Sequence, residues 1–351
     1  PFVAGVMISA SHNPYQDNGI KVFAHSGFKL PDSQEEQVEA GIERLRGSGQ
    51  APRSLEVDRA LAGEYLDYLA ACGPARKIPG LKLVVDCANG ASFQLAPRLF
   101  ERLGVRSVII ADRPDGRNIN LDCGSLHLGA LRERVLDCGA DLGVAFDGDA
   151  DRALFISAAG AEINGDGILW MAARHYGAPL VVATTMSNLG LEKALAGAGI
   201  GLVRTAVGDK YVLEEMLRRD AELGGEQSGH VIFRRHATTG DGLLTALKVL
   251  EIMAETGRTL DQLVADLPAY PQTIRNVPVR TRTPLAEIPA LGEAIQASEQ
   301  ELGNRGRIIV RYSGTELLAR VMVEAETPDE VERHAGRLSR VIAQHLGGGS
   351  Y

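Results

Sequence analysis

The sequence has few cysteines and no long apolar run, and both absences narrow its class. The four cysteines are Cys72, Cys87, Cys123 and Cys138. They form neither a CxxC pair nor a zinc-like spacing, so we expect free thiols in the reducing cytoplasm. No apolar stretch reaches the length of a membrane span, and no signal peptide is visible. These absences predict a soluble cytoplasmic protein without a membrane partner.

The sequence also lacks an excess of positive charge. Its formal net charge is −8, with 37 Lys and Arg against 45 Asp and Glu. A nucleic-acid partner would have to be met by a basic face, so this balance argues against one. A small anionic substrate is still compatible, because local arginines and helix N-termini bind phosphate within an acidic protein.

Apolar strand-like runs alternate with helix-like runs along most of the chain, which predicts an α/β fold with parallel strands and crossover helices. The last segment differs, since two long helical runs accompany a strand pair, as in a small α+β domain. The expected strands are 81–86, 105–111, 141–146, 180–185, 202–207, 274–279, 307–311 and 320–324. The expected helices are 33–46, 58–72, 93–103, 126–138, 168–176, 189–198, 211–219, 242–255, 288–302 and 328–346.

A chain of 351 residues is expected to form two to four domains, because single cores stop growing well before this size. It begins with Pro1 almost directly before an apolar run, so we expect further residues in front. We expect an incomplete first domain over 1–73, α/β domains over 74–162 and 163–272, and the α+β domain over 273–351.

Residues 8–21 contain the first candidate site. An apolar run ends there in the letters SASHNP, followed by an Asn-Gly turn. Open α/β folds place their ligands in loops at strand ends. Ser11 is a candidate nucleophile, because a serine hydroxyl becomes reactive beside a base or a metal, and His12 and Lys21 lie close in sequence. The alternative is an Asn-Pro turn with an incidental serine.

The sharpest local signal is the acidic stretch DGDADR, which directly follows the apolar run 142–146. Asp147, Asp149 and Asp151 can converge on one hard cation, and oxygen ligands of this kind favour Mg²⁺ over zinc. The loop does not match an EF-hand, which ends in glutamate after twelve residues. The alternative is a solvated acidic turn.

Two further loops carry polar groups that suit a phosphorylated sugar. Glu226 and Ser228 alternate in GEQSGH, as paired sugar hydroxyls would require, although a polar hairpin is the plain alternative. The stretch RYSGTE combines a guanidinium, two hydroxyls and free N–H groups around glycine, which can surround a phosphate. An ordinary hairpin turn explains that stretch equally well. Lys210 is most simply explained as part of a helix start, and the alternative is that it adds positive charge to a phosphate site.

Taken together and in this order, the four loops resemble those of the α-D-phosphohexomutase superfamily. SASHNP is similar to its phosphoserine loop, DGDADR to its metal loop, GEQSGH to its sugar loop and RYSGTE to its phosphate loop. The glutamine in GEQSGH, with GDKYV and TTGDG around it, is most similar to the phosphoglucosamine branch. The resemblance covers residues 3–346 and implies three related α/β domains, the first incomplete here, and a C-terminal α+β domain around a central active-site cleft.

The resemblance also implies an isomerase and its site. Glucosamine 6-phosphate and glucosamine 1-phosphate would interconvert through a phosphoserine and glucosamine 1,6-bisphosphate, in the supply of UDP-N-acetylglucosamine and cell-wall precursors. The implied partner is a phosphosugar, with a homodimer as the candidate assembly. If Lys21 were the catalytic base, its pKa would have to be lowered. The implied residues are Ser11, His12, Lys21 and Arg152 for catalysis, Ser11 with Asp147, Asp149 and Asp151 for one Mg²⁺, and Glu226, Ser228, His230, Lys210, Arg311, Ser313, Gly314 and Thr315 for substrate.

Three alternatives stay open at this point. The first is a phosphomannomutase or phosphoglucomutase of the same superfamily. The second is a metal-dependent phosphatase whose nucleophile is an aspartate of the 147–151 loop. The third is a non-catalytic binding protein or an inactive fragment that lacks the start of domain 1.

Overall fold

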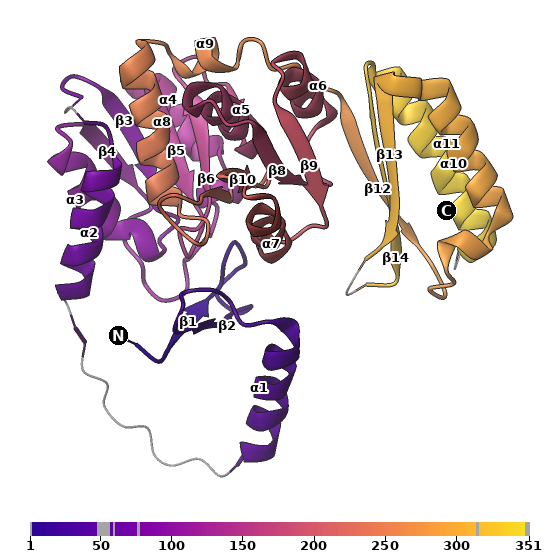
Figure 1. Cartoon of the computed structure of the whole chain (residues 1–351), viewed down its shortest axis with the longest axis horizontal. Coiled ribbons are helices and arrows are strands. Elements are labelled where there is room, and N and C mark those ends of the chain that lie inside the picture. The colour runs from indigo at the N-terminus through magenta and orange to yellow at the C-terminus, as the bar shows by residue number, and fades with distance from the viewer. Residues whose placement is uncertain (1, 48–56, 59, 76–77, 314–315, 348–351) are drawn as a thin grey trace. The chain divides into compact units, whose positions relative to one another are not determined.

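The computed structural model describes residues 2–47, 57–58, 60–75, 78–313 and 316–347. The chain forms two compact units, one of residues 1–187 with 195–266 and one of residues 188–194 with 267–351. Figure 1 traces the elements of both units along the chain.

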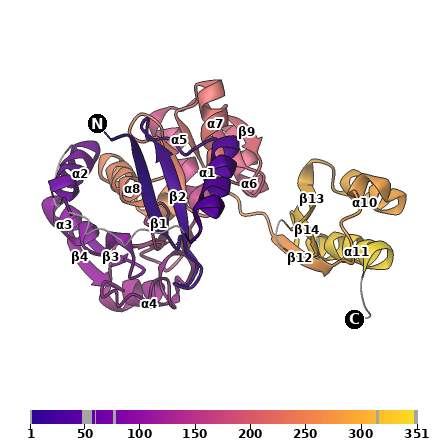
Figure 2. The same cartoon turned by 90° about the horizontal axis from the view of Figure 1, so that it is seen from below.

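The first unit opens with an antiparallel hairpin of β1 (Ala4–Ser9) and β2 (Gly19–Ala24), in which Ser9 pairs with Gly19. Helix α1 (Asp32–Leu45) follows and buries none of its side chains. Figure 2 shows the hairpin strands side by side. The chain then reaches α2 (Ala60–Cys72), which packs its buried leucines against α3 and α8.

A five-stranded sheet in the order β4-β3-β5-β6-β7 forms the next part of this unit. Its first three strands are parallel, as the alternation of strands and helices predicts, and β6 and β7 add antiparallel strands. Leu131 and Val135 of α4 cover one face of the sheet. The elements are β3 (Lys82–Asp86), α3 (Leu95–Arg102), β4 (Arg106–Ile110), α4 (Gly129–Cys138), β5 (Leu142–Phe146), β6 (Ala153–Ser157) and β7 (Glu162–Ile163).

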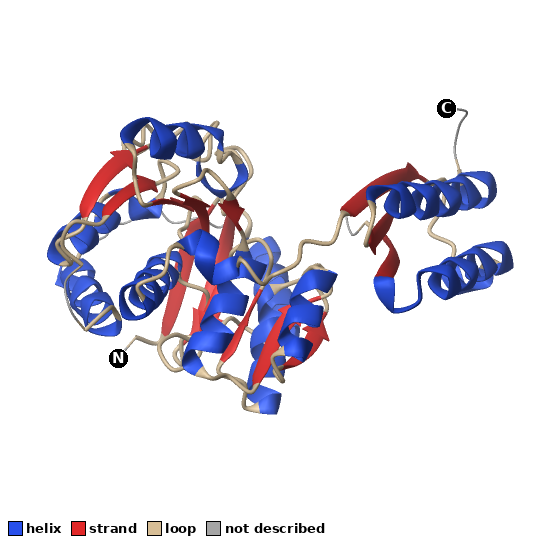
Figure 3. Ribbon diagram, turned by 90° about the horizontal axis from the view of Figure 1, so that it is seen from above, coloured by secondary structure: helices blue, strands red, loops and turns tan. Residues whose placement is uncertain are grey.

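A four-stranded sheet in the order β11-β10-β8-β9 completes the first unit, with β10, β8 and β9 parallel. Figure 3 shows its strands covered by helices. Asn164 caps α5 by accepting the N–H groups of Asp166 and Gly167, and Asp241 caps α8. The elements are α5 (Gly165–Tyr176), β8 (Leu180–Thr184), β9 (Gly201–Thr205), α7 (Asp209–Arg219), β10 (Leu223–Gly225), β11 (Val231–Phe233), α8 (Gly242–Thr256) and α9 (Leu260–Val264). Helix α6 (Leu189–Gly197) follows β8 in the sequence, and its residues 189–194 are assigned to the second unit.

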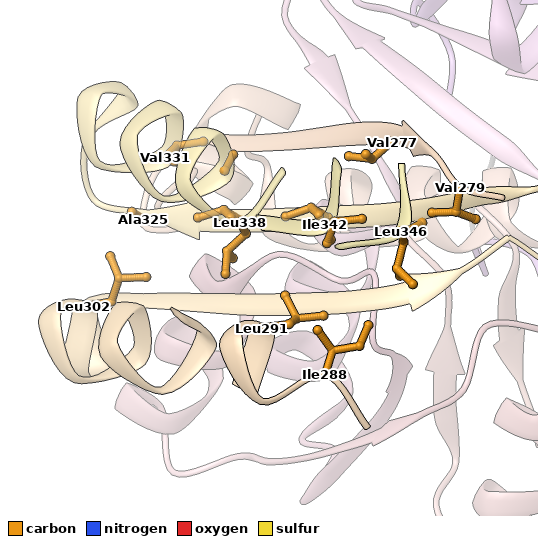
Figure 4. Packing of buried hydrophobic residues seen from close by; sticks show 14 residues of the cluster. Val277, Val279, Ile288, Leu291, Leu302, Ala325, Val331, Leu338, Ile342 and Leu346 are labelled. Atoms are coloured by element: carbon orange, nitrogen blue, oxygen red, sulfur yellow. The ribbon is translucent and has the colours of Figure 1, made fainter. Parts of the chain in front are cut away.

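The second unit contains an antiparallel sheet in the order β12-β14-β13, formed by β12 (Gln272–Pro278), β13 (Gly306–Tyr312) and β14 (Leu318–Ala325). Helices α10 (Pro289–Leu302) and α11 (Pro328–Leu346) accompany it. Leu338 and Ile342 of α11 point at the sheet in Figure 4, beside Leu291 of α10. The helices thus bury their apolar stripes on the strands, as an α+β domain requires.

The predicted fold class is confirmed: parallel-sheet α/β folding in the first unit and an α+β fold in the second. The helices expected over 93–103 and 126–138 begin later, at Leu95 and Gly129, because the short turns Ala91–Phe93 and Gly124–Leu126 come first. The predicted domain boundaries stay a prediction. None of the described helices is long and apolar enough to cross a membrane.

Candidate active site

Ser11 lies just after β1, and its backbone has the left-handed φ of 49°. Residues other than glycine rarely adopt this conformation, and it persists only where the surroundings hold it. The Ser11 N–H donates to Ser9 Oγ at 2.9 Å, and the N–H of Gly148 donates to the Ser11 carbonyl at 2.9 Å. The side chain is partly exposed, with Oγ 3.1 Å from His12 Nδ1. The backbone of Ser11 is therefore fixed while its hydroxyl stays accessible.

The three predicted aspartates meet directly after β5, where each places one oxygen within 4.8 Å of the others. Each carboxylate has one oxygen facing a protein donor and one that does not. The engaged oxygens are Asp147 Oδ1 with the Arg152 N–H (3.1 Å), Asp149 Oδ2 with the Ser9 hydroxyl (2.6 Å) and Lys21 Nζ (2.5 Å), and Asp151 Oδ2 with Lys21 Nζ (3.4 Å) and His230 Nδ1 (3.5 Å).

The other three oxygens are buried and find no hydrogen-bond donor among the described residues: Asp147 Oδ2, Asp149 Oδ1 and Asp151 Oδ1. Buried polar atoms are almost always paired, so three unpaired oxygens in one place call for a ligand. A convergent set of carboxylate oxygens fits a hard divalent cation. The trio therefore presents the ligand set of a divalent-cation site.

The pKa shifts of the aspartates show that negative charge is concentrated at the trio. Burial, together with the charges of Asp151 and Asp149, raises the pKa of Asp147 well above its usual range. Burial acts in the same direction on Asp151, but the hydrogen bond from His230 and the charges of Lys21 and Arg152 hold the pKa of that carboxyl well below its usual range. A bound cation would relieve the repulsion between the buried carboxylates.

Lys21 behaves in the opposite way to a lysine base. Burial acts to lower its pKa, but the charges and hydrogen bonds of Asp151 and Asp149 outweigh it, so the pKa is raised. Lys21 is thus protonated, and its ammonium neutralises the acidic loop. The lowered pKa that a base role requires is not found.

His12 and Arg152 flank Ser11 and the acidic loop. Burial, with the charge of Arg152, lowers the pKa of His12, so its imidazole is neutral at neutral pH. Arg152 Nε lies 4.0 Å from Asp147 Oδ2 and 3.9 Å from Asp151 Oδ1, too far for hydrogen bonds to either. This nitrogen is buried and has no hydrogen-bond partner in the part of the chain that the structure describes. The Arg152 guanidinium is thus held near the acidic loop by charge, and its Nε keeps a hydrogen-bond donor unused.

Glu226 and Ser228 line a hollow of about 480 Å³ together with His12 and Arg152. Glu226 Oε1 accepts the N–H of Gly208 at 3.0 Å, and Oε2 lies 3.4 Å from the Ser228 hydroxyl. Three of the loops singled out from the sequence thus border one space. The hollow is also lined by Leu154, Glu162, Asn164, Thr184, Met186, Val207 and Gln227.

His230 and Lys210 occupy other places. His230 is buried, and the Gly240 N–H donates to its Nε2 at 3.0 Å, which leaves the ring proton on Nδ1, facing Asp151. Lys210 forms an ion pair with Asp32 and donates to the Leu30 carbonyl at 3.2 Å. Neither side chain lines the hollow beside Glu226.

The predicted phosphate loop belongs to the second unit. Arg311 is exposed near the end of β13, and Ser313 follows it with a buried side chain. In the sheet register Arg311 lies directly opposite Arg320 of β14, whose Nη2 lies 3.4 Å from Glu316 Oε2. One carboxylate balances only one of the two guanidinium charges, so a bound anion would neutralise the other. Arg320 is therefore a candidate phosphate ligand that sequence reasoning missed. Gly314 and Thr315 lie outside the described residues.

Two further residues of the site, Ser9 and Asn120, were not predicted from the sequence. Ser9 links Ser11 to Asp149, because its hydroxyl donates to the carboxylate and its oxygen accepts the Ser11 N–H. Its spacing of two from Ser11 was the available signal. Asn120, whose side chain donates to the carbonyls of Ser11 and Asn13, gave no local signal, since it lies about a hundred residues away.

Sequence models of all four domains of the phosphoglucomutase/phosphomannomutase family match the chain. The matches are domain I over 2–47, domain II over 63–160, domain III over 164–270 and the C-terminal domain over 274–341. The chain belongs to this family. The predicted resemblance to the phosphohexomutases is confirmed.

Curated relatives place the chain closer to one branch. A protein of Solibacter usitatus named phosphoglucosamine mutase is 54% identical, over 99% of this chain and 79% of that relative. One of Koribacter versatilis with the same name is 48% identical, over 99% of this chain and 78% of the relative. The chain is thus similar to phosphoglucosamine mutases, which are isomerases.

Solved structures share the fold at lower identity. A phosphoglucomutase/phosphomannomutase family protein of Burkholderia thailandensis is 23% identical with a TM-score of 0.77, covering 97% of this chain and 76% of its own. The N-acetylphosphoglucosamine mutase of Aspergillus fumigatus, solved with GlcNAc-6P and magnesium, is 21% identical with a TM-score of 0.72, covering 97% and 89%.

Proposed function

We propose that the chain interconverts glucosamine 6-phosphate and glucosamine 1-phosphate, the activity named for its curated relatives. The observation that carries the mechanism is the aspartate trio, in which each carboxylate keeps one buried oxygen free beside the loop of Ser11. This arrangement supplies an accessible hydroxyl next to a cation site, which is what phosphoryl transfer to and from a serine needs.

In the proposed reaction Ser11 carries a phosphoryl group at rest. The P–O bond to Ser11 Oγ breaks as a new P–O bond forms to O1 of glucosamine 6-phosphate, and the O1 hydroxyl loses its proton. The resulting glucosamine 1,6-bisphosphate then presents its other phosphate, which returns to Ser11 Oγ and leaves glucosamine 1-phosphate with a proton on O6. The phosphoserine is regenerated, the sugar again carries one phosphate, and the proton lost from O1 is balanced by the proton gained on O6, so no further reactant is needed.

The free oxygens of Asp147, Asp149 and Asp151 are the proposed ligands of Mg²⁺, which when bound would neutralise charge on the transferring group. Among the side chains near Ser11, His12 is the proposed base, because its neutral imidazole lies 3.1 Å from Oγ. Protonated Lys21 and Arg152 are proposed to stabilise negative charge during transfer.

The remaining contacts are divided among the other loops. Glu226 and Ser228 are proposed to bind sugar hydroxyls in the hollow that they share with His12 and Arg152. Arg311, Ser313 and Thr315 are proposed ligands of the phosphate that is not being transferred, with Arg320 as a fourth. We propose that each predicted domain, 1–73, 74–162, 163–272 and 273–351, supplies one loop to the reaction, with His230 and Lys210 supporting loops rather than touching substrate.

The first test is an intact-mass and peptide-mapping measurement after incubation with glucosamine 1,6-bisphosphate and Mg²⁺. We expect one added phosphoryl group on Ser11 and none in Ser11→Ala, whose turnover should fall on the order of 10³-fold or more. Ser33→Ala, at an exposed position of helix α1, is the matched control and should behave as wild type. A phosphoryl group on an aspartate of the 147–151 loop instead would identify the phosphatase alternative.

The second test concerns the sugar. Turnover of the 1- and 6-phosphates of glucosamine, glucose and mannose should be compared by kcat/KM, with the glucosamine pair expected to lead. A preference for mannose or glucose phosphates would favour the phosphomannomutase or phosphoglucomutase alternative. Arg311→Ala should raise KM about 10- to 100-fold for every sugar alike, because a charged contact to phosphate is lost.

A further inference from the structure

Asn120 ties the second α/β part of the first unit to the loop of Ser11. It lies between β4 and the short turn Gly124–Leu126, and its side chain is buried. Its Nδ2 donates to the Ser11 carbonyl at 2.9 Å and to the Asn13 carbonyl at 2.8 Å. Because both partners accept, only the NH₂ end of the amide fits there. Both side-chain N–H groups of Asn120 thus donate to carbonyls of the serine loop.

The Ser11 carbonyl is held from a second side by the acidic loop. The N–H of Gly148 donates to it at 2.9 Å. A Cβ at position 148 would lie 2.5 Å from this carbonyl oxygen and 2.8 Å from Asn120 Nδ2. Gly148 and Asn120 therefore form a close cradle around a single oxygen, and that oxygen belongs to the residue with the left-handed backbone.

Asn120 is itself anchored to the five-stranded sheet. Its N–H donates to the Ala88 carbonyl at 2.9 Å, and the Ala88 N–H donates to Asp86 Oδ1 at 2.9 Å. Asp86 is fully buried at the end of β3 and also accepts the Gly124 N–H at 2.8 Å. A chain of hydrogen bonds thus runs from a central strand to the carbonyl of Ser11.

We propose that Asn120 is a positioning residue for phosphoryl transfer, whose amide holds the backbone of Ser11 so that the serine hydroxyl stays aligned with the aspartate trio. The need for such a residue follows from the left-handed backbone of Ser11, which persists only where surrounding groups hold it. The kinetic part of the proposal rests on the function proposed above.

The test compares Asn120→Asp and Asn120→Ala with Asn118→Asp. Both changes at 120 remove the two donors, and the aspartate also keeps the shape of the side chain. Asn118 lies in the same loop, but its Nδ2 donates to the Arg113 carbonyl and does not touch the serine loop. We expect kcat to fall about 10- to 100-fold in both Asn120 variants while KM stays within about 3-fold, because a small displacement of a reacting group has this cost. Asn118→Asp should change both constants less than about 3-fold.

A second measurement does not depend on turnover. Amide hydrogen exchange of the peptide that contains Gly148 should quicken in both Asn120 variants and not in Asn118→Asp, because the N–H of Gly148 donates to the carbonyl that Asn120 holds. Unchanged exchange, or an equal loss of kcat in Asn118→Asp, would overturn the proposal. A further outcome is that wild-type protein turns over no glucosamine phosphate while the exchange at Gly148 still quickens in the Asn120 variants. In that case the proposed function would be wrong, but the proposal that Asn120 holds the Ser11 carbonyl would stand.

Discussion

In segment 2–47, which holds the serine loop, only two of the described side chains are buried, whereas every residue of β5 and β6 is buried. Helix α1 of the first region leaves Ile42 58% exposed, while Leu131 of α4 is fully buried against the sheet of the second region. The hairpin is held to the acidic loop by the polar contacts of Ser9, Ser11 and Lys21 instead.

This difference shows which groups fix the position of the serine loop. The backbone of Ser11 has a left-handed conformation that persists only where its surroundings hold it. A reactive group on such a loop keeps its place only if groups on a rigid element hold it. Here Gly148, Asn120 and Asp149 come from the well-packed α/β part, and each contacts the serine loop directly.

Truncating an apolar side chain should lower the free energy of unfolding much more in the α/β part than in segment 2–47, and this is the largest effect that we expect. Leu131→Ala removes a fully buried side chain and should lower the free energy of unfolding by about 3 kcal/mol. Ile42→Ala in α1 should cost less than about 0.5 kcal/mol, because the side chain is largely exposed. Urea unfolding of both variants measures this. Equal losses would show that the two regions are packed alike.

Metal binding should stabilise the region that carries the trio. Mg²⁺ at about 100 times its Kd should raise the free energy of unfolding by about 2.7 kcal/mol, and a chelator should reverse the gain. Asp149→Asn should reduce the gain, because it weakens one of the three ligands. Thermal unfolding with and without Mg²⁺ gives the answer, and a gain that survives in Asp149→Asn would place the ion elsewhere.

The smallest expected effect tests the cradle around the Ser11 carbonyl. In Gly148→Ala the new Cβ meets that oxygen at 2.5 Å, so the weakly packed serine loop should give way. We expect kcat to fall about 10-fold with a melting temperature near that of wild type. Gly129→Ala, where a Cβ meets nothing within 4 Å, is the matched control and should keep full activity. A large drop in melting temperature with unchanged kcat would contradict the picture.

Local patterns in the sequence predicted much of the fold. The strands expected over 81–86 and 141–146 are β3 and β5 to within one residue, because apolar runs bounded by turn residues mark buried strands. The antiparallel strands β6, β7 and β11 were not foreseen as such, since strand direction depends on the partner rather than on local composition.

The sequence by itself determined the residue types that do chemistry: a serine beside a histidine at a strand end, three aspartates at a spacing of two, and a Glu–Ser pair between glycines. Only the tertiary structure decided that Asp151 and Asp149 raise the pKa of Lys21 against the effect of burial, that each aspartate of the trio keeps one oxygen without a hydrogen-bond donor among the described residues, and that Asn120 donates to the Ser11 carbonyl. The reason is physical: residue type and spacing are local properties, whereas a pKa and the pairing of a buried oxygen depend on groups that folding brings from distant parts of the chain.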